Sequence, residues 1–422
     1  MNSQSYTKTT LSNGVKILSM HIPHVRSVAM GVWLDTGSRD EYPEENGMAH
    51  FIEHMLFKGT TTRSAYEIAK AFDAIGGHTN AFTSMESTCF HAKAIDTHLE
   101  KMSDILSDIF LNPAFIPEEM ENELQVVLQE ISMTEDNSDE YVHLLFDSHF
   151  WEGHPFSRSI LGTPEMLMSF TRDDVLKFFR RNYDPQKVII AAAGNMEHSR
   201  VVDLVGKRFE TIKSGLGFPD RTPPVIRPHV MVHEKDIEQA HICIGMNGIN
   251  YTSPDRFAAG IMNTILGGNM SSRLFQEIRE KRGLAYNVYS FNSTNTDSGS
   301  FGVYAGVAPE NAQKSVALIK KELDRLIKET VSQSEFDAAR EFIRGNILLA
   351  EENTDGQVMR IAQNEAYFGR FISVEEVSEK LDQVTREDIQ RLASECFSPE
   401  SLALTALGPD LDRNKLKEAL YS

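Results

Sequence analysis

Hydrophobic and polar residues follow two periodicities along this chain, one typical of strands and one typical of helices. Short apolar runs and alternating segments predict strands at residues 28–34, 78–94, 241–246 and 285–306. Amphipathic stretches predict helices at residues 64–75, 257–266 and 273–281. The chain is therefore expected to combine sheets and helices in one fold.

The order of these elements repeats. Each half starts with a strand, continues with two helices and two strands, and then predicts a long helix pair, at residues 99–131 and 312–347. Residues 80–84 also line up with residues 287–291. Such repetition predicts two copies of one structural unit. The expected fold class is α+β, with two homologous domains that are each a mostly antiparallel sheet covered by helices.

A proline- and glycine-rich stretch at residues 214–228 lies between the two copies and interrupts both periodicities. At 422 residues the chain is also too long for one ordinary core. We therefore expect one domain at residues 1–213, a linker at 214–228 and a second domain at 229–422.

The most distinctive segment places His50, Glu53 and His54 in an otherwise apolar run. In a helix, His50 and His54 lie one turn apart on one face, and Glu53 lies beside them. Burying such groups is costly unless partners compensate, and a zinc ion bound by two imidazoles is such a partner. The His-x-x-Glu-His spacing is also the inverted zinc-protease motif.

The alternative is structural, with one histidine packed in a core or capping a helix and Glu53 paired with a distant arginine. At the matching positions the second copy carries an apolar run, residues 257–262. A purely structural helix need not differ between copies in this way. The difference favours one zinc site per chain, in the first copy.

A catalytic zinc ion held by two imidazoles needs a third protein ligand, with water in the remaining position. Residues 116–131 predict a helix with acids in its first turn, where the helix dipole favours them. Glu123 and Glu130 lie two turns apart at the margin of its apolar stripe. The alternative is that both are solvated helix acids like Glu118 and Glu119.

Composition narrows the kinds of partner, metal site and cellular location that fit this chain. The net charge of −19 argues against a nucleic-acid partner and suits a basic peptide substrate, although it also suits simple solubility. The three cysteines, Cys89, Cys243 and Cys396, indicate neither a disulfide framework nor a thiolate metal site. We find no secretion signal and no apolar run of membrane-spanning length, so we expect a cytoplasmic protein without a membrane partner.

With these residues in view, the chain resembles the pitrilysin or insulinase family of zinc endopeptidases over essentially its whole length. Further resembling segments are residues 57–60, 80–83, 266–268, 271–275 and 282–286. They look like the branch that contains the β subunit of mitochondrial processing peptidase and its bacterial relatives. The resemblance implies a zinc metalloendopeptidase that hydrolyses peptide bonds.

Carried over by position, the resemblance assigns zinc binding to His50, His54 and Glu130. It makes Glu53 the general base that takes a proton from water, and Glu123 a second acid beside the site. Members of the family that are inactive typically lose part of this set. An active enzyme is therefore favoured over a non-catalytic scaffold or partner subunit of the same fold.

The resemblance also implies substrate contacts. Arg279 and Tyr286 match a pair that contacts substrate near the scissile carbonyl, although alone they look like a surface cation and a strand residue. The strand around Asn80, Ala81 and Phe82 resembles an edge strand that pairs with an extended peptide. Recognition is then expected to depend on main-chain hydrogen bonds, with loose side-chain preference.

Two other readings of the chain are weaker. Gly267 and Gly268 lack the remaining residues of a phosphate loop, and a zinc deaminase would need a cysteine pair that is absent.

The resemblance also has an implication for assembly, because longer members of the family enclose a chamber with four repeats and this chain has two. It implies a homodimer in which Arg279 and Tyr286 face the zinc of the partner.

Overall fold

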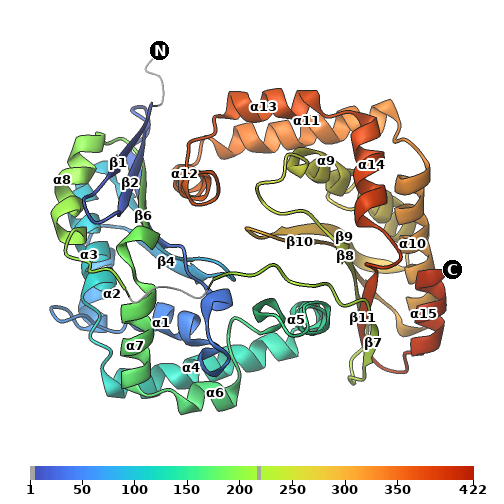
Figure 1. Ribbon diagram of the computed structural model, residues 1–422, viewed down its shortest axis with the longest axis horizontal. Coiled ribbons are helices and arrows are strands. Elements are labelled where there is room, and N and C mark those ends of the chain that lie inside the picture. The colour runs from blue at the N-terminus through green and yellow to red at the C-terminus, as the bar shows by residue number, and fades with distance from the viewer. Residues whose placement is uncertain (1–4, 216–219) are drawn as a thin grey trace. The chain divides into compact units, whose positions relative to one another are not determined.

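The fold is described from a computed structural model, which covers residues 5–215 and 220–422 (Figure 1). The chain forms two compact units, each with one sheet. The first unit takes the chain up to Ser132, then Ser159–Arg221 and Leu349–Ile372. The second takes Met133–Arg158, Thr222–Leu348 and Ser373–Ser422.

The strands of the first unit are β1 (Ser5–Thr10), β2 (Lys16–His21), β3 (Ser27–Leu34), β4 (His78–Thr83), β5 (Thr88–Ile95) and β6 (Val188–Gly194). Its helices are α1 (Met48–Leu56), α2 (Ala65–Asp73), α3 (Leu99–Leu111), most of α4 (Pro117–Asp136), α6 (Pro164–Ser169), α7 (Arg172–Asn182), α8 (His198–Phe209) and α12 (Thr354–Phe368).

The strands of the second unit are β7 (Val230–His233), β8 (Ala240–Asn247), β9 (Ala285–Thr294), β10 (Gly299–Val307) and β11 (Ala403–Leu407). Its helices are α5 (Ser138–Phe150), α9 (Arg256–Leu266), a π-helix at Phe275–Glu280, α10 (Ala312–Lys328), most of α11 (Gln333–Ala350), α13 (Val374–Gln383), α14 (Arg386–Cys396) and α15 (Arg413–Tyr421).

The two sheets share one topology. The first has the order β1-β2-β6-β3-β5-β4 and the second the order β7-β11-β8-β10-β9. In each sheet one pair is parallel, β2 with β6 and β7 with β11, and the other pairs are antiparallel. The predicted α+β class and the predicted duplication are therefore confirmed, with β1 as an addition to the first copy.

The central strands are apolar because helices cover both faces of each sheet. Every residue of β6 and of β10 is buried, as expected for strands without a solvent face. In the first unit α3 and α8 pack on one face of the sheet, over a core that includes Ile17, Val32 and Phe110. Helix α12 packs on β2, β3 and β6, over a second cluster that includes Trp33, Ile189 and Ile361.

Helices are exchanged between the two halves of the sequence. Helix α12 comes from the second half but belongs to the first unit, and α5 comes from the first half but packs on β8 and β11 of the second unit. The compact units therefore differ from the predicted division at residues 213 and 229, because each sheet covers an apolar face with a helix that is distant in sequence. Of the predicted linker at 214–228, residues 216–219 lie outside the described residues.

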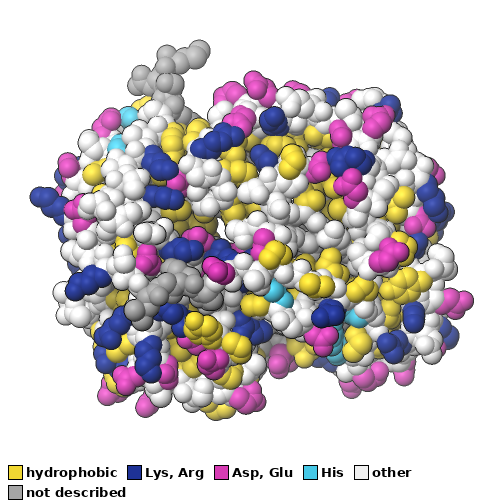
Figure 2. All heavy atoms as spheres, in the orientation of Figure 1, with side chains coloured by type: hydrophobic (Ala, Val, Ile, Leu, Met, Phe, Trp, Pro, Cys, Tyr) yellow, Lys and Arg dark blue, Asp and Glu magenta, His cyan; other side chains and the backbone are white. Residues whose placement is uncertain are grey.

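The surface carries charges of both signs. Figure 2 shows acidic and basic side chains interspersed over the face drawn there, with apolar side chains between them. The negative net charge is thus not gathered into one acidic patch on that face. Among the helices of residues 5–215 and 220–422, none is long and apolar enough to cross a membrane.

Candidate metal centre

The loop before α1 determines where this helix starts. Gly47 precedes it with a φ of 96°, a conformation that favours glycine, and a Cβ there would lie 2.8 Å from the backbone oxygen of Leu161. The carboxylate of Glu41 accepts hydrogen bonds from the backbone nitrogens of Gly47 and Ala49, at 3.0 and 2.8 Å. These contacts anchor the start of a nine-residue helix that is buried except at His54.

Helices α1 and α4 bring three predicted ligands together. The Nε2 atoms of His50 and His54 lie 3.2 Å apart. The Oε2 atom of Glu130 lies 3.7 Å from His50 Nε2 and 3.6 Å from His54 Nε2. Among the described residues, this is the one group of three or more histidine, cysteine or acidic side chains with ligand atoms within 4.8 Å of one another.

These separations fit one zinc ion. With zinc bonds of about 2.0–2.1 Å in a tetrahedral arrangement, neighbouring ligand atoms lie roughly 3.3 Å apart. The observed distances of 3.2 to 3.7 Å are close to that value. Two imidazoles and one carboxylate also form a donor set of catalytic zinc sites that leave one position for water.

Glu123 has a different place from Glu130. It is buried, and its Oε1 atom lies 2.7 Å from His54 Nδ1, the ring nitrogen that does not face the other ligands. Lys58 donates to the second oxygen, Oε2, at 2.6 Å. A carboxylate bound to the remote nitrogen of a histidine ligand fixes the orientation of that ring. The second acid predicted beside the site therefore holds His54.

The two histidines have opposite electrostatic environments. Burial, with the charge of His54, lowers the pKa of His50 to about 3, which keeps its imidazole neutral as a metal ligand must be. Burial also acts to lower the pKa of His54, but the hydrogen bond and charge of Glu123 outweigh it and raise that pKa. The Nδ1 atom of His50 is buried and has no hydrogen-bond partner among the described residues.

Glu53 lies beside the ligands but points to a different partner. Its Oε2 atom accepts a hydrogen bond of 2.6 Å from the hydroxyl of Thr83, the last residue of β4. Burial raises the pKa of Glu53, against the opposing effect of this hydrogen bond. Glu53 and His54 also line an open cavity of about 340 Å³ together with Phe57, Lys58, Thr79, Asn80, Ala81 and Glu123.

The predicted substrate strand is an edge strand. Strand β4 pairs with β5 and is the last strand of its sheet. Asn80 is exposed and Ala81 and Phe82 are half-buried. The ring of Phe82 packs edge-on against Trp33, with centroids 5.4 Å apart, so the strand is anchored by packing. Its outer edge has no neighbouring strand among residues 5–215 and 220–422. This arrangement leaves backbone groups available for another extended chain.

In the second unit the structure brings Arg279 and Tyr286 together. The Arg279 guanidinium lies 4.9 Å from the centre of the Tyr286 ring and 4.7 Å from that of Phe275, within cation–π distance of both. Tyr286 is 78% exposed. The segment predicted as a helix at 273–281 is a π-helix over its central residues, with Lys281 bonding back to Gln276. Such π-helical turns are rare in proteins, and those that occur are often found at functional sites.

Comparison with known proteins identifies the family. A family model described as Insulinase (Peptidase family M16) matches residues 16–164, and a second, described as Peptidase M16 inactive domain, matches residues 169–343. The chain belongs to the M16 peptidase family. The segment matched by the first model contains His50, Glu53, His54 and Glu130, and the segment matched by the second contains the apolar counterpart at 257–262.

M16 relatives of similar length support this assignment. An uncharacterized zinc protease of Bacillus subtilis, YmxG, is 39% identical over 400 residues, which are 95% of this chain and 97% of that protein. An uncharacterized zinc protease of Streptomyces coelicolor is 38% identical, with 98% and 92% covered. Their names place them among metalloproteases.

Solved structures share the M16 fold. A protease from Helicobacter pylori has a TM-score of 0.88 at 24% identity, with 96% of this chain and 100% of that chain covered. A Pseudomonas fluorescens protein described as a peptidase M16 inactive domain has a TM-score of 0.90 at 18% identity, with 96% and 99% covered. At these identities the likeness shows the fold alone.

The sequence did not reveal three neighbours of the predicted site residues, Thr83, Lys58 and Phe275. The resembling segments included all three, but without a role. Phe275 lies four positions before Arg279, a spacing that places side chains together on a helix. Lys58 lies beyond the end of α1 and contacts Glu123, which is distant in sequence, so no local spacing indicated this contact. For Thr83 no sequence signal was available, because its contact with Glu53 joins a strand to a helix thirty residues earlier.

Proposed function

We propose that this protein is a zinc-dependent endopeptidase that hydrolyses extended peptides or unfolded segments. The observation that carries the proposal is the set of three mutually facing ligand atoms from His50, His54 and Glu130, with Glu53 beside them and the edge strand β4 next to the same cavity. The zinc proteases among the M16 relatives support it.

In this proposal His50, His54 and Glu130 hold one zinc ion per chain. When bound, zinc supplies Lewis acidity, which lowers the pKa of water to about 7 and polarises a carbonyl group. Glu123 keeps His54 oriented through Nδ1. Glu53 accepts a proton from the attacking water and later delivers it to the leaving amine, a role that suits a carboxylate whose pKa is raised by burial.

The substrate is proposed to lie along β4 as an added strand. Backbone groups of Asn80, Ala81 and Phe82 would hydrogen-bond the peptide, which gives binding energy that depends little on side chains. The adjoining cavity would accept a substrate side chain. A net charge of −19 supports a preference for basic peptides. The three cysteines are unpaired thiols, in keeping with a cytoplasmic location.

The proposed test of function is hydrolysis of a mixed peptide library by the purified chain, with and without a zinc chelator. Glu53→Gln is the matched control, because the amide fills the same volume but cannot accept the proton. We expect chelator-sensitive cleavage by the wild type, and a loss of about 100-fold or more in the zinc-loaded variant. Equal cleavage by both proteins would reject Glu53 as the base.

The second candidate is a non-catalytic scaffold or partner subunit of the same fold. The match of residues 169–343 to a model described as an inactive domain favours such a role for that part of the chain. Metal content separates the two candidates, since a scaffold has no need of the ligands. A zinc-free wild-type protein that binds but never cleaves peptides would support the scaffold.

We further propose a homodimer whose halves complement each other. Longer family members, in which four repeats enclose a chamber, suggest that Arg279 and Tyr286 of one chain serve the zinc site of its partner. Mixing inactive Glu53→Gln with inactive Arg279→Ala should then restore part of the activity, because some mixed dimers contain one site without either change. No recovery after demonstrated subunit exchange would overturn this arrangement.

A further inference from the structure

The hydroxyl of Thr83 connects the edge strand to the carboxylate beside the metal site. Thr83 Oγ1 donates to Glu53 Oε2 at 2.6 Å. Within the described part of the chain, no other hydrogen bond to the Glu53 side chain is present. Thr83 thus holds one of the two carboxylate oxygens, Oε2. A carboxylate held at one oxygen has a restricted side-chain orientation.

The end of β4 is itself held firmly, so this contact has a defined position. Directly after Thr83, the backbone of Ser84 donates to the Ser87 carbonyl at 2.7 Å and closes the turn to β5. The carboxylate of Glu86 in this turn forms a buried ion pair with Arg39. The backbone carbonyl of Glu86 accepts a hydrogen bond of 3.1 Å from Arg221.

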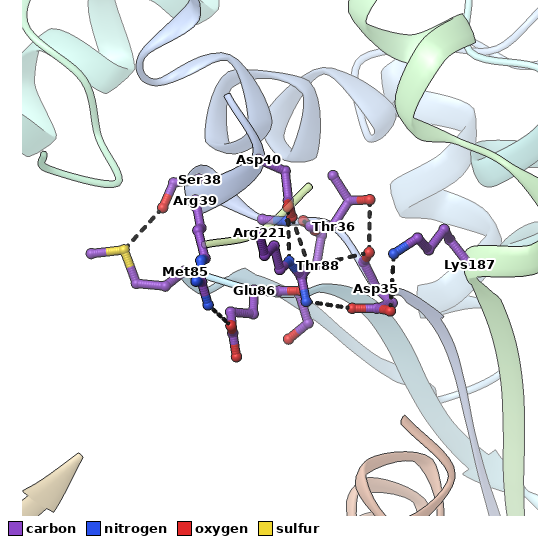
Figure 3. A network of polar contacts seen from close by, with 12 residues as sticks. Asp35, Thr36, Ser38, Arg39, Asp40, Met85, Glu86, Thr88, Lys187 and Arg221 are labelled. Carbon is purple, nitrogen blue, oxygen red and sulfur yellow. Dashed lines mark hydrogen bonds and ion pairs between the residues drawn. The ribbon is translucent and has the colours of Figure 1, made fainter. Parts of the chain in front are cut away.

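Arg221 joins the same turn to the loop that precedes α1. Figure 3 shows its guanidinium among the side chains of Asp35 and Asp40, which it contacts at 3.1 and 2.8 Å. Asp40 in turn accepts from the backbone nitrogen of Gly37 at 3.0 Å. The turn after the strand that carries Thr83 and the loop that leads to the helix of Glu53 therefore share one polar network, which is partly buried.

We propose that Thr83 is a positioning residue for Glu53, so that the strand expected to pair with substrate also orients the general base. This inference rests on the proposed peptidase function. Thr83 acts through its side chain on Glu53, whereas the strand is expected to bind peptide through its backbone. Loss of the hydroxyl should therefore lower kcat and leave KM and zinc content nearly unchanged.

Thr83→Val removes the hydroxyl at constant shape, and Thr83→Ser retains it. We expect kcat to fall about 10- to 100-fold in Thr83→Val, a range typical of groups that orient catalytic residues, and to recover in Thr83→Ser. KM and the zinc content of the purified protein should stay within twofold of wild type. Unchanged kcat in Thr83→Val would overturn the proposal, and so would loss of zinc.

The matched control is Thr88→Val. Thr88 lies opposite Thr83 on β5, but its hydroxyl donates to the Thr36 carbonyl at 3.0 Å and not to Glu53. The Thr88→Val substitution should lower the stability of the protein without lowering kcat. An equal fall of kcat in Thr83→Val and Thr88→Val would show that the strand, and not the contact with Glu53, is responsible, and would overturn the proposal.

A crystal structure of zinc-loaded Thr83→Val provides a readout that does not depend on activity. Glu53 should leave the orientation that it has in the wild-type crystal or become disordered. An unchanged Glu53 overturns the positioning role whether or not the enzyme cleaves peptides. A wild-type protein that binds zinc but cleaves no peptide overturns the proposed function instead, so the two failures are distinct.

Discussion

Helices α1 and α9 pack against corresponding edge strands, β4 and β9, of two sheets with the same topology. The two helices differ in the side chains that they bury. Helix α1 buries His50 and Glu53 among apolar residues, whereas α9 buries Ala258, Ile261 and Met262. The second helix is an ordinary core element. The first carries polar groups whose burial is costly without partners. The fold therefore does not need these groups, and their presence in one copy indicates a function for that copy.

Making α1 more like α9 should produce the largest effect. His50→Leu removes one proposed zinc ligand together with a buried Nδ1 that has no hydrogen-bond partner among the described residues. We expect the variant to lose zinc and peptidase activity completely. Without zinc it should be more stable than the metal-free wild type by about 1 kcal/mol, because an unsatisfied buried group is removed. Elemental analysis and thermal unfolding in chelator measure the two effects.

A lower stability of metal-free His50→Leu would contradict the view that this histidine is retained for function. Retention of zinc by the same variant would show that His50 is not a ligand.

The two glutamates of α4 should differ in their effect on zinc. Glu130→Gln replaces a proposed charged ligand and should weaken zinc binding more than 100-fold, whereas Glu123→Gln only replaces the charged partner of His54 Nδ1 by a neutral amide and should weaken it about 10- to 100-fold. Competition with a fluorescent chelator measures both affinities. If Glu123→Gln has the greater effect, the assignment of the third ligand is wrong.

A packing difference between the two exchanged helices can also be tested. A Cβ on Gly245 of β8 would lie 2.0 Å from the Phe146 ring of α5, whereas a Cβ on Gly31 of β3 would lie 3.3 Å from Val358 of α12. Gly245→Ala should therefore lower stability by about 1–3 kcal/mol and Gly31→Ala by less. Thermal unfolding of both variants is the measurement. Equal melting temperatures would mean that α5 can shift without cost.

Lys58→Met should have the smallest effect. Its ammonium group lies 2.6 Å from Glu123 Oε2, but the side chain is 31% exposed, so solvent screens the interaction. We expect zinc affinity to fall less than tenfold and to recover in Lys58→Arg. A loss of more than tenfold in Lys58→Met would show that the orientation of His54 by Glu123 depends on this partner far more than its exposure suggests. No loss at all in Lys58→Met would show that Glu123 orients His54 independently of Lys58.

Local pattern was sufficient to predict much of the fold. The strand predicted at 28–34 is β3 (Ser27–Leu34), and the helix predicted at 64–75 is α2 (Ala65–Asp73) with Ser64 as its N-cap. These elements are predictable because hydrophobic periodicity and capping residues act over a few positions. The same reasoning placed His50, Glu53 and His54 on one helical turn.

By itself the sequence thus determined the elements, their duplication and the one copy that carries His50, Glu53 and His54 where the other has the apolar run 257–262. The residue pattern alone did not separate Glu123 from Glu130, which lie two turns apart on one helix, and only the family resemblance assigned Glu130 to the metal. The tertiary structure showed that Glu130 faces both histidines while Glu123 contacts the opposite ring nitrogen of His54. It also decided the partner of Glu53 and the exchange of α5 and α12. Such contacts join residues that are distant along the chain, and their geometry depends on how whole elements pack together, which no local pattern records.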